Sequence, residues 1–270
     1  MSRASAVMGG GEIDPEHAMA AAYPDLAVKV VLVTGGASGI GGAISRAFAA
    51  QGSTVILFDI LRDEGEGLAQ ELRQGGASAH FREVDLRDIP ALRRGIEAVN
   101  DRHGPIEVLI NNAAHDERHA TESVTPDYWD DRIAVNLKHQ FFAAQAVLPE
   151  MKAAQRGVII NFGSTSWMAG QGGMAAYTAS KSGVIGLTRS LARDYGPYNI
   201  RVNAIAPGWI MTERQIEKWL TPESEAELMQ RQCLKRRLVP DELARFTLFL
   251  ASDEASACTA QHYVVDGGWV

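Results

Sequence analysis

Short apolar runs alternate with longer amphipathic segments along nearly the whole chain. Two runs, 106–110 and 158–160, show little alternation of apolar and polar residues, as expected of strands that helices cover on both faces. The predicted strands lie near residues 29–34, 54–59, 78–84, 107–111, 157–162, 200–205 and 262–265. The predicted helices lie near residues 40–51, 63–73, 90–102, 127–152, 175–195, 213–231 and 240–251. This order predicts an α/β domain with a doubly wound parallel sheet and helices on both faces.

Chemically distinctive residues follow the ends of several predicted strands. These residues are Gly35, Asp59, Asp85, Asn112, Ser164 and Pro207. In an open parallel sheet, ligands bind outside the carboxyl ends of the strands. The positions therefore predict one shared site at that edge of the sheet.

A glycine-rich turn joins the first predicted strand to the first predicted helix, in the segment Thr34–Gly42. Its glycines follow the spacing Gly35-x-x-x-Gly39-x-Gly41, which is wider than the common dinucleotide fingerprint. Bare backbone N–H groups and the helix dipole favour a phosphate at such a turn. A plain loop is the alternative for a glycine-rich turn alone. The strand before it and the helix after it favour a nucleotide site in a single Rossmann-type domain.

Asp59 ends the next predicted strand, about 20 residues after the glycines. A carboxylate there is placed to accept hydrogen bonds from the adenosine ribose, and it would repel a 2′-phosphate. Ser38 in the turn is not basic, which also favours NAD over NADP. Arg62 follows closely and leaves room for use of both cofactors. A solvated acid at a strand end is the alternative for Asp59 taken alone.

Tyr177 and Lys181 lie four residues apart and therefore share one face of a predicted helix. A phenol with its ordinary pKa of about 10 is a weak base near neutral pH. A fixed ammonium beside it favours the phenolate. Ser164, after an upstream strand, would hold the oxygen of an alcohol or carbonyl, which together makes a general acid and base for alcohol oxidation. A half-buried Tyr on an amphipathic helix is the alternative for the pair alone.

Taken in order, these motifs resemble the short-chain dehydrogenase/reductase family from about Thr34 to the C-terminus. The motifs are Thr34-Gly-x-x-x-Gly-Ile-Gly41, Asp85, Asn111-Asn-Ala-Ala114, Asn136, Ser164, Tyr177-x-x-x-Lys181 and Pro207-Gly208. The resemblance implies a nicotinamide cofactor and a catalytic set of Asn136, Ser164, Tyr177 and Lys181. In the family this Asn bends its helix and holds a water that links the Lys to solvent.

The resemblance also implies the cofactor contacts. They are Gly35, Ser38, Gly39, Ile40, Gly41, Asp59, Ile60, Asp85, Leu86, Asn112, Ala113, Ala114, Tyr177, Lys181, Pro207, Gly208, Ile210 and Thr212. Asp85 is expected to accept from the adenine amino group; on its own it would be a helix cap. Ala114 departs from the family, which usually has Gly there, and its methyl group should narrow the cofactor space slightly.

Several stretches resemble a narrower group within the family, the bacterial D-xylose 1-dehydrogenases. They include Asp116-Glu-Arg-His119, Tyr128-Trp-Asp-Asp-Arg132, Val135-Asn-Leu-Lys-His139 and Arg214-Gln-Ile-Glu-Lys-Trp219. Related enzymes act on L-fucose, L-arabinose or sulfonated glucose (sulfoquinovose), so the resemblance implies an aldose 1-dehydrogenase rather than one sugar. Residues 209–232 are expected to form a substrate lid. The expected substrate contacts are Ser164, Trp167, Tyr177, Arg118, His119, Gln171, Trp209, Arg214 and Trp219.

Composition narrows the possible domain organisation, partners and compartment of the protein. The length of 270 residues suits one α/β domain, and a formal charge of −7 argues against nucleic acid or an anionic membrane as a partner. Residues 1–25 carry no apolar core typical of a signal peptide and suggest a flexible extension before a domain at 26–270. Two cysteines fit a reducing cytoplasm. The family implies a homotetramer, and the apolar tail through Trp269 would suit a subunit contact.

The expected reaction is oxidation of a ring-closed aldose at C1 to the lactone, with Tyr177 as the base and NAD as the cofactor. Dehydrogenation of another polyol, a sugar acid or a secondary alcohol stays open. A 3-oxoacyl or other ketone reductase is disfavoured by Asp59 and the hydrophilic lid. A non-catalytic NAD-binding regulator is disfavoured by the intact Ser164, Tyr177 and Lys181. His115 and His119 lie four residues apart, but they follow a strand, and no metal is expected.

Overall fold

The computed structural model describes residues 21–270. Residues 1–20 of the expected N-terminal extension lie outside the described part of the chain. Within the described part, Pro24–Leu26 forms a 3₁₀ turn, and the Leu26 side chain is fully buried in the core. Lys29 and Asp25 form an ion pair at 2.9 Å. Chain from Tyr23 onward therefore packs against the domain.

Seven parallel strands form one sheet in the order β3-β2-β1-β4-β5-β6-β7. The strands are β1 (Val30–Thr34), β2 (Thr54–Asp59), β3 (Ser78–Glu83), β4 (Val108–Asn111), β5 (Gly157–Phe162), β6 (Ile200–Pro207) and β7 (His262–Val265). Strand order reverses direction between β1 and β4, so the crevice outside their carboxyl ends is the expected ligand site. The predicted fold class is confirmed.

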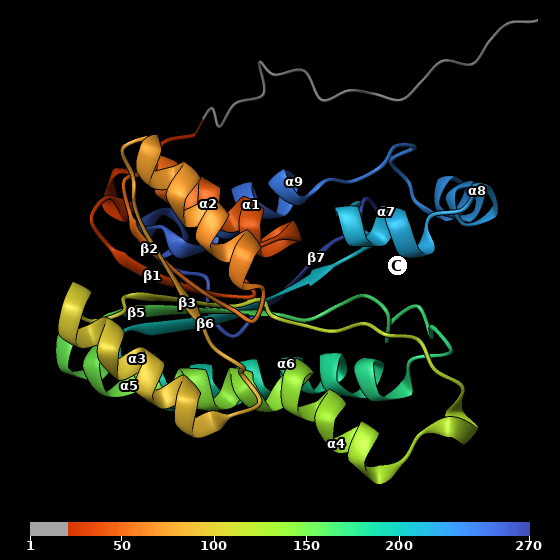
Figure 1. Cartoon of the computed structure of the whole chain (residues 1–270), viewed down its shortest axis with the longest axis horizontal. Coiled ribbons are helices and arrows are strands. Elements are labelled where there is room, and N and C mark those ends of the chain that lie inside the picture. The colour runs from red at the N-terminus through yellow and green to blue at the C-terminus, as the bar shows by residue number, and fades with distance from the viewer. Residues whose placement is uncertain (1–20) are drawn as a thin grey trace, which may run out of the picture.

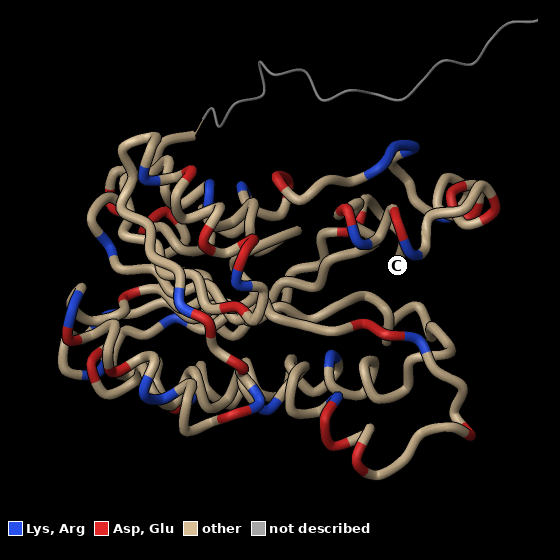
Figure 2. The backbone as a smooth tube through the Cα atoms, viewed as in Figure 1, with Lys and Arg blue, Asp and Glu red and all other residues tan. Residues whose placement is uncertain are grey.

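Two layers of helices cover the sheet (Figure 1). The layer with α1 (Gly39–Ala50), α2 (Arg62–Gln74) and α9 (Pro240–Ala251) covers one face. The layer with α3 (Ile89–His103), α4 (Pro126–Ile133), α5 (His139–Ala154) and α6 (Ala175–Tyr195) covers the other. Charged residues concentrate on these layers and on the loops (Figure 2). One buried apolar cluster lies under each layer, which explains why the central strands are apolar throughout.

Two predicted helices are each divided in the structure. The segment predicted as 127–152 comprises α4, a π-helical turn at Ala134–Lys138 and α5. The segment predicted as 213–231 comprises α7 (Glu213–Trp219) and α8 (Pro222–Arg231). The prediction of one continuous helix over 213–231 was wrong because Pro222 disfavours helical backbone at Thr221. Thr221 instead caps α8 with its side chain.

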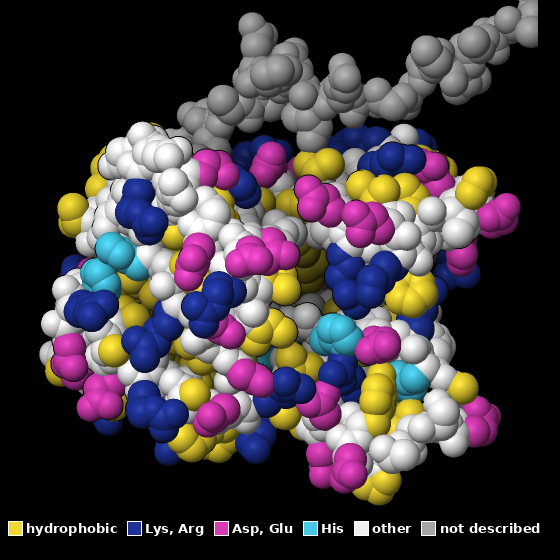
Figure 3. Space-filling model, viewed as in Figure 1, with side chains coloured by type: hydrophobic (Ala, Val, Ile, Leu, Met, Phe, Trp, Pro, Cys, Tyr) yellow, Lys and Arg dark blue, Asp and Glu magenta, His cyan; other side chains and the backbone are white. Residues whose placement is uncertain are grey.

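The helices α7 and α8 extend beyond the carboxyl edge of the sheet, near the C-terminus of the chain (Figure 1). Figure 3 shows the molecule from the same side as Figure 1. The surface is hollowed near its middle, and charged side chains of both signs surround the opening. No helix within residues 21–270 combines the length and the apolar character that crossing a bilayer requires.

Candidate active site

The glycine turn brings three backbone segments into close contact. A side chain at Gly41 is excluded because its Cβ atom would lie 1.8 Å from the carbonyl oxygen of Gly35. The Thr34 hydroxyl accepts from the backbone N–H groups of Asn112 (3.1 Å) and Ala113 (3.2 Å), which ties the ends of β1 and β4 together. Ser38 occupies the N-cap of α1 without a hydrogen bond from its side chain to the helix. The helix therefore begins with backbone N–H groups that an anion can bind.

Asp59 lies at the end of β2 and is 9% exposed. Its carboxylate accepts from the backbone N–H groups of Ala37 (3.1 Å), Ile60 (2.8 Å) and Leu61 (3.2 Å). These bonds fix the carboxylate beside the glycine turn and leave acceptor capacity on its oxygens. Arg62 forms ion pairs with Glu66 and Glu83 and is not directed to Asp59.

A cavity of about 540 Å³ runs along this edge of the sheet. Its lining includes Gly35, Ser38, Ile40, Gly41, Asp59, Ile60, Asp85, Leu86, Asn112, Ala113, Ala114, Tyr177 and Thr212. The Asp85 carboxylate accepts from the Arg87 guanidinium, which lowers the pKa of that carboxyl group. Asp85 therefore stays ionised and able to accept from a ligand. Gly39 does not line the cavity; a Cβ atom there would meet the Thr212 methyl group at 3.2 Å.

Asn136 lies in the π-helical turn and is fully buried. Its amide oxygen accepts from the backbone N–H of His115 (2.8 Å), and its amide nitrogen donates to the carbonyls of His115 (3.1 Å) and Arg132 (2.9 Å). The side chain thus holds the loop after β4 against the distorted helix. The wider turn is a local departure from regular α-helix at the position where the resemblance implies a bend.

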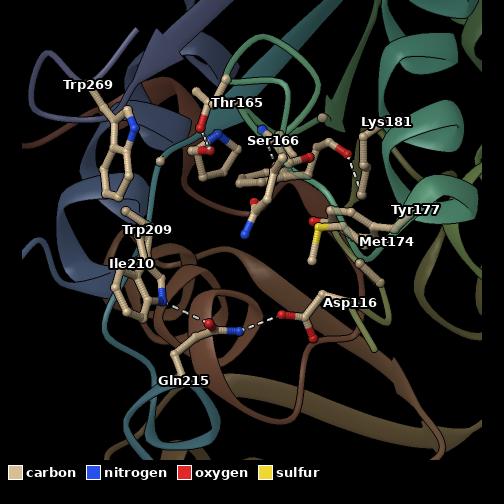
Figure 4. Close-up of a pocket in the computed structure, with 18 of the residues that line it drawn as sticks. Asp116, Thr165, Ser166, Met174, Tyr177, Lys181, Trp209, Ile210, Gln215 and Trp269 are labelled. Carbon is tan, nitrogen blue, oxygen red and sulfur yellow. Dashed lines mark hydrogen bonds between the residues drawn. The ribbon is translucent and has the colours of Figure 1, made fainter. Parts of the chain in front are cut away.

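Ser164, Tyr177 and Lys181 meet between β5 and α6. Ser164 lies beside the Tyr177 hydroxyl, and its Oγ accepts from the Ser166 backbone N–H at 3.1 Å. The Lys181 ammonium is 5.7 Å from the centre of the Tyr177 ring and donates to the Phe162 carbonyl at 2.7 Å (Figure 4). Helical spacing therefore places the two side chains as the sequence predicts.

Burial has the largest influence on the pKa of both groups. Burial raises the pKa of the Tyr177 phenol, the Ser164 hydroxyl beside it lowers it, and the charge of Asp116 raises it. Burial lowers the pKa of the Lys181 ammonium to about 7, and the charge of Asp116 opposes that change. The expected lowering of the Tyr177 pKa is therefore reversed in the protein alone, because desolvation of the phenolate outweighs the effect of Ser164.

A second cavity, of about 530 Å³, adjoins the first. The residues that line both cavities are Ile40, Asn112, Ala114, Asp116, Tyr177, Thr212 and Gln215. Side chains from the expected lid segment lie along one side of this junction (Figure 4). Trp209 Nε1 donates to Gln215 Oε1 at 2.8 Å, Gln215 Nε2 donates to Asp116 Oδ2 at 2.6 Å, and Arg214 pairs with Asp116 at 3.2 Å.

The expected substrate residues divide into two groups. Ser164, Tyr177, Arg118, Gln171 and Trp209 line the second cavity, and Arg214 lines the first. Trp167, His119 and Trp219 line neither. Trp167 lies 6.3 Å from the His262 ring, His119 contacts Tyr128 at 3.0 Å, and Trp219 lies under the Arg118 guanidinium at 4.4 Å. These three were expected from their neighbours in sequence, but tertiary packing directs them elsewhere.

Several other residues that line the second cavity were not predicted as substrate contacts, among them Asp116, Ser166, Met174 and Trp269. Asp116 belongs to a stretch that carries the resemblance to D-xylose 1-dehydrogenases, so the sequence offered a reason to expect it near the substrate. Pro207, Gly208, Ile210 and Lys181 line the second cavity, although they were expected as cofactor contacts.

The residues present fit a nicotinamide dinucleotide. The bare start of α1 suits a pyrophosphate, the fixed carboxylate of Asp59 suits ribose hydroxyls, and the lining of the first cavity includes both Asp59 and Tyr177. Within residues 21–270, no group of three or more His, Cys, Asp or Glu side chains is arranged to bind a metal ion.

Comparison with known proteins agrees with this geometry. The sequence model of a protein family described as enoyl-(acyl carrier protein) reductase matches residues 35–270. A probable galactose dehydrogenase from Rhizobium meliloti (strain 1021) is 48% identical over 91% of this chain and 96% of its own length. D-xylose 1-dehydrogenase from Caulobacter vibrioides (strain NA1000 / CB15N) is 46% identical over 92% and 98%. The crystal structure of gox2181 is 31% identical and covers 91% of this chain and 98% of its own, with a TM-score of 0.87.

Proposed function

The chain belongs to the short-chain dehydrogenase/reductase family, and on that premise we propose that it oxidises a ring-closed aldose at C1 to the lactone, with NAD as the cofactor. The observation that carries the proposal is that Tyr177 lines both cavities, with Ser164 beside it in the second. Tyr177, the proposed proton acceptor, therefore lies between the cavity proposed for the dinucleotide and the cavity proposed for the sugar.

In the proposed reaction, the C1 hydroxyl lies against Ser164 and Tyr177. Tyr177 as phenolate takes the hydroxyl proton, and Ser164 holds the substrate oxygen. Lys181 as an ammonium stabilises the phenolate and contacts the nicotinamide ribose, while Asn136 supports the proton path to solvent. NAD supplies the hydride acceptor when bound. General base catalysis of this kind contributes about 10²- to 10⁴-fold to a rate.

Preference for NAD over NADP is supported by Asp59. Its carboxylate is held in place by three backbone N–H groups, so it cannot swing away from a 2′-phosphate without breaking them. Arg62, the nearest basic residue in sequence, is paired with two glutamates. The cofactor contacts of the first cavity are proposed as in the sequence analysis, with Gly39 acting through the turn.

An aldose is supported by the second cavity and by the relatives. The cavity combines the indole of Trp209 with the polar groups of Arg118, Gln171 and Asp116, which suits a ring with apolar faces and many hydroxyls. Two relatives at 46–48% identity are named as galactose and D-xylose dehydrogenases. We further propose a homotetramer in a reducing cytoplasm, a setting that fits the free Cys233 and Cys258.

The test is the initial rate of NADH formation with D-xylose, D-galactose, L-arabinose, L-fucose, D-glucose and sulfoquinovose, repeated with NADP. The proposal expects rapid turnover of at least one aldose with NAD, a lactone product, and a much lower rate with NADP. Absence of turnover on all of these aldoses, with NAD binding intact, would reject the sugar assignment in favour of other polyols or secondary alcohols.

A further inference from the structure

The C-terminal segment Asp266–Val270 is folded into a compact hook by one buried carboxylate. Asp266 is 5% exposed and accepts from the backbone N–H groups of Gly268 (2.8 Å), Trp269 (3.0 Å) and Val270 (2.9 Å). Gly267 and Gly268 have φ values of +67° and +80°, in the left-handed region where glycine has no steric cost. The sequence Asp-Gly-Gly-Trp therefore specifies where the indole of Trp269 goes.

The hook packs against the chain that leaves the lid. The carbonyls of Gly268 and Gly267 accept from the backbone N–H groups of Cys233 (3.0 Å) and Leu234 (2.9 Å). A Cβ atom at Gly208 would lie 2.6 Å from Asp266, so the hook also contacts the end of β6. Trp269 is thereby held as part of the wall of the second cavity rather than as a free terminal residue.

Two polar atoms in this wall are buried and have no hydrogen-bond partner among residues 21–270. They are Trp269 Nε1, a donor, and Ser166 Oγ, which can donate or accept. Ser166 is 6% exposed. Trp269 lies across the cavity from Tyr177, above Trp209 (Figure 4). Ser166 and Trp269 line the same cavity as Ser164 and Tyr177.

A buried donor without a partner destabilises a fold, so its retention needs a compensating contact. A sugar hydroxyl provides one, because it both donates and accepts. The Ser166 backbone N–H also donates to Ser164 Oγ, which fixes the position of Ser166 relative to the group that would hold the C1 oxygen.

We propose that Trp269 and Ser166 form a specificity subsite that binds a hydroxyl of the substrate remote from its reacting carbon. This proposal rests on the proposed function for the identity of the substrate as an aldose. The subsite selects polyhydroxylated rings, because a substrate without the hydroxyl leaves both groups unpaired in the complex. It also gives the C-terminal hook a role in recognition in place of the subunit contact expected from its apolar sequence.

The experiment compares Trp269→Phe and Ser166→Ala with the wild-type protein on the best substrate and on its monodeoxy analogues. Phe retains a flat aromatic wall and removes only the Nε1 donor. Trp129→Phe is the matched control, since Trp129 lies on α4 and lines neither cavity. The expected result is an about tenfold rise in KM for the full substrate, the loss expected from one hydrogen bond. For one deoxy analogue, the variant and the wild-type protein should have equal KM.

An equal loss on every deoxy analogue, or no loss on the full substrate, would overturn the subsite while leaving aldose oxidation in place. If the wild-type protein oxidises another polyol but no aldose, the proposed function fails, and the deoxy series of that polyol decides the subsite independently. A change in sedimentation behaviour of Trp269→Phe, without any change in KM, would assign Trp269 to a subunit contact and also overturn the proposal.

Discussion

The first cavity, proposed for the cofactor, and the second cavity, proposed for the substrate, are built by different means, although they share the wall at Tyr177. The first is shaped mainly by backbone: a turn that excludes a side chain at Gly41, and a carboxylate at Asp59 held by main-chain N–H groups. The second is assembled from side chains of distant segments, as in the link from Trp209 through Gln215 to Asp116. Cofactor binding is therefore encoded locally, whereas substrate recognition depends on how separate segments pack together.

The largest effect is expected where the two regions meet. Tyr177→Phe should lower kcat by about 10³-fold, because the proton acceptor is lost, and leave NAD affinity unchanged. Stopped-flow turnover and calorimetric NAD titration measure the two quantities. Tyr198→Phe is a matched control: Lys152 Nζ lies 4.5 Å from the Tyr198 ring centre, but the pair lines neither cavity. Normal turnover by the Tyr177 variant would show that Tyr177 is not the general base.

The next effect concerns the cofactor region alone. Gly41→Ala should weaken NAD binding at least about tenfold and lower the free energy of unfolding by about 2 kcal/mol, because the new methyl group overlaps the Gly35 carbonyl. Gly67→Ala is the control, since a Cβ atom there meets nothing within 4 Å and a helical Ala should stabilise by about 0.5–1 kcal/mol. Equal behaviour of the two variants in urea unfolding would contradict the backbone origin of this cavity.

A smaller effect is expected from the link at the junction of the two cavities, where Asp116 and Gln215 line both. Asp116→Asn should raise KM for the sugar several-fold, because the ion pair with Arg214 is lost, and leave NAD affinity nearly unchanged. Since the Asp116 charge raises the pKa of Tyr177, the variant should also reach maximal kcat at lower pH. Glu122→Gln, an exposed change in the same loop region, should shift neither. An unaltered pH profile would show that Asp116 acts only through packing.

The smallest effect on activity, but a measurable effect on stability, is expected at His139. Its ring is fully buried, and both ring nitrogens have no hydrogen-bond partner within the described residues. Burial, reinforced by the charge of Lys181, lowers the pKa of His139 to about 3. With an unfolded pKa of about 6.5, this group leaves stability intact above pH 6.5 and reduces it as the pH falls toward 3.

His139→Leu should therefore flatten the loss of melting temperature between pH 6.5 and 4, and at pH 7 it should be neutral or slightly stabilising. Differential scanning calorimetry at several pH values measures this. His80→Gln is a control because His80, although its pKa is also lowered, is only partly buried on β3. If the melting temperatures of His139→Leu and the wild-type protein fall equally between pH 6.5 and 4, the buried His139 does not cause the loss of stability in acid.

The sequence predicted the strands to within a residue or two, because apolar runs and the glycines after them are local signals. The residue pattern predicted a regular helix through Asn136, and only the family resemblance implied a bend there, since the contacts of Asn136 are with His115, 21 residues away. Trp167 was expected in the substrate cavity because it follows Ser164 by three residues, and Trp219 because of the mix of side chains around it, but neither lines that cavity, whereas Trp269 does. The sign of the Tyr177 pKa shift required knowledge of burial, which residue spacing does not provide.

The π-helical turn at Ala134–Lys138 has a consequence for how this chain tolerates change in length. Such a turn contains one residue more than the regular helix around it. Deleting one residue there would convert the turn into regular α-helix and leave the helix on either side in nearly the same orientation, because five residues of the wider turn cover about the same rotation as four residues of an α-helix. The contacts between Asn136 and the loop after β4 would then lose the turn that positions them. A single-residue deletion within Ala134–Lys138 should therefore preserve the packing of α5 and release that loop, whereas a single-residue insertion in the regular helix on either side would rotate its two parts by about 100°.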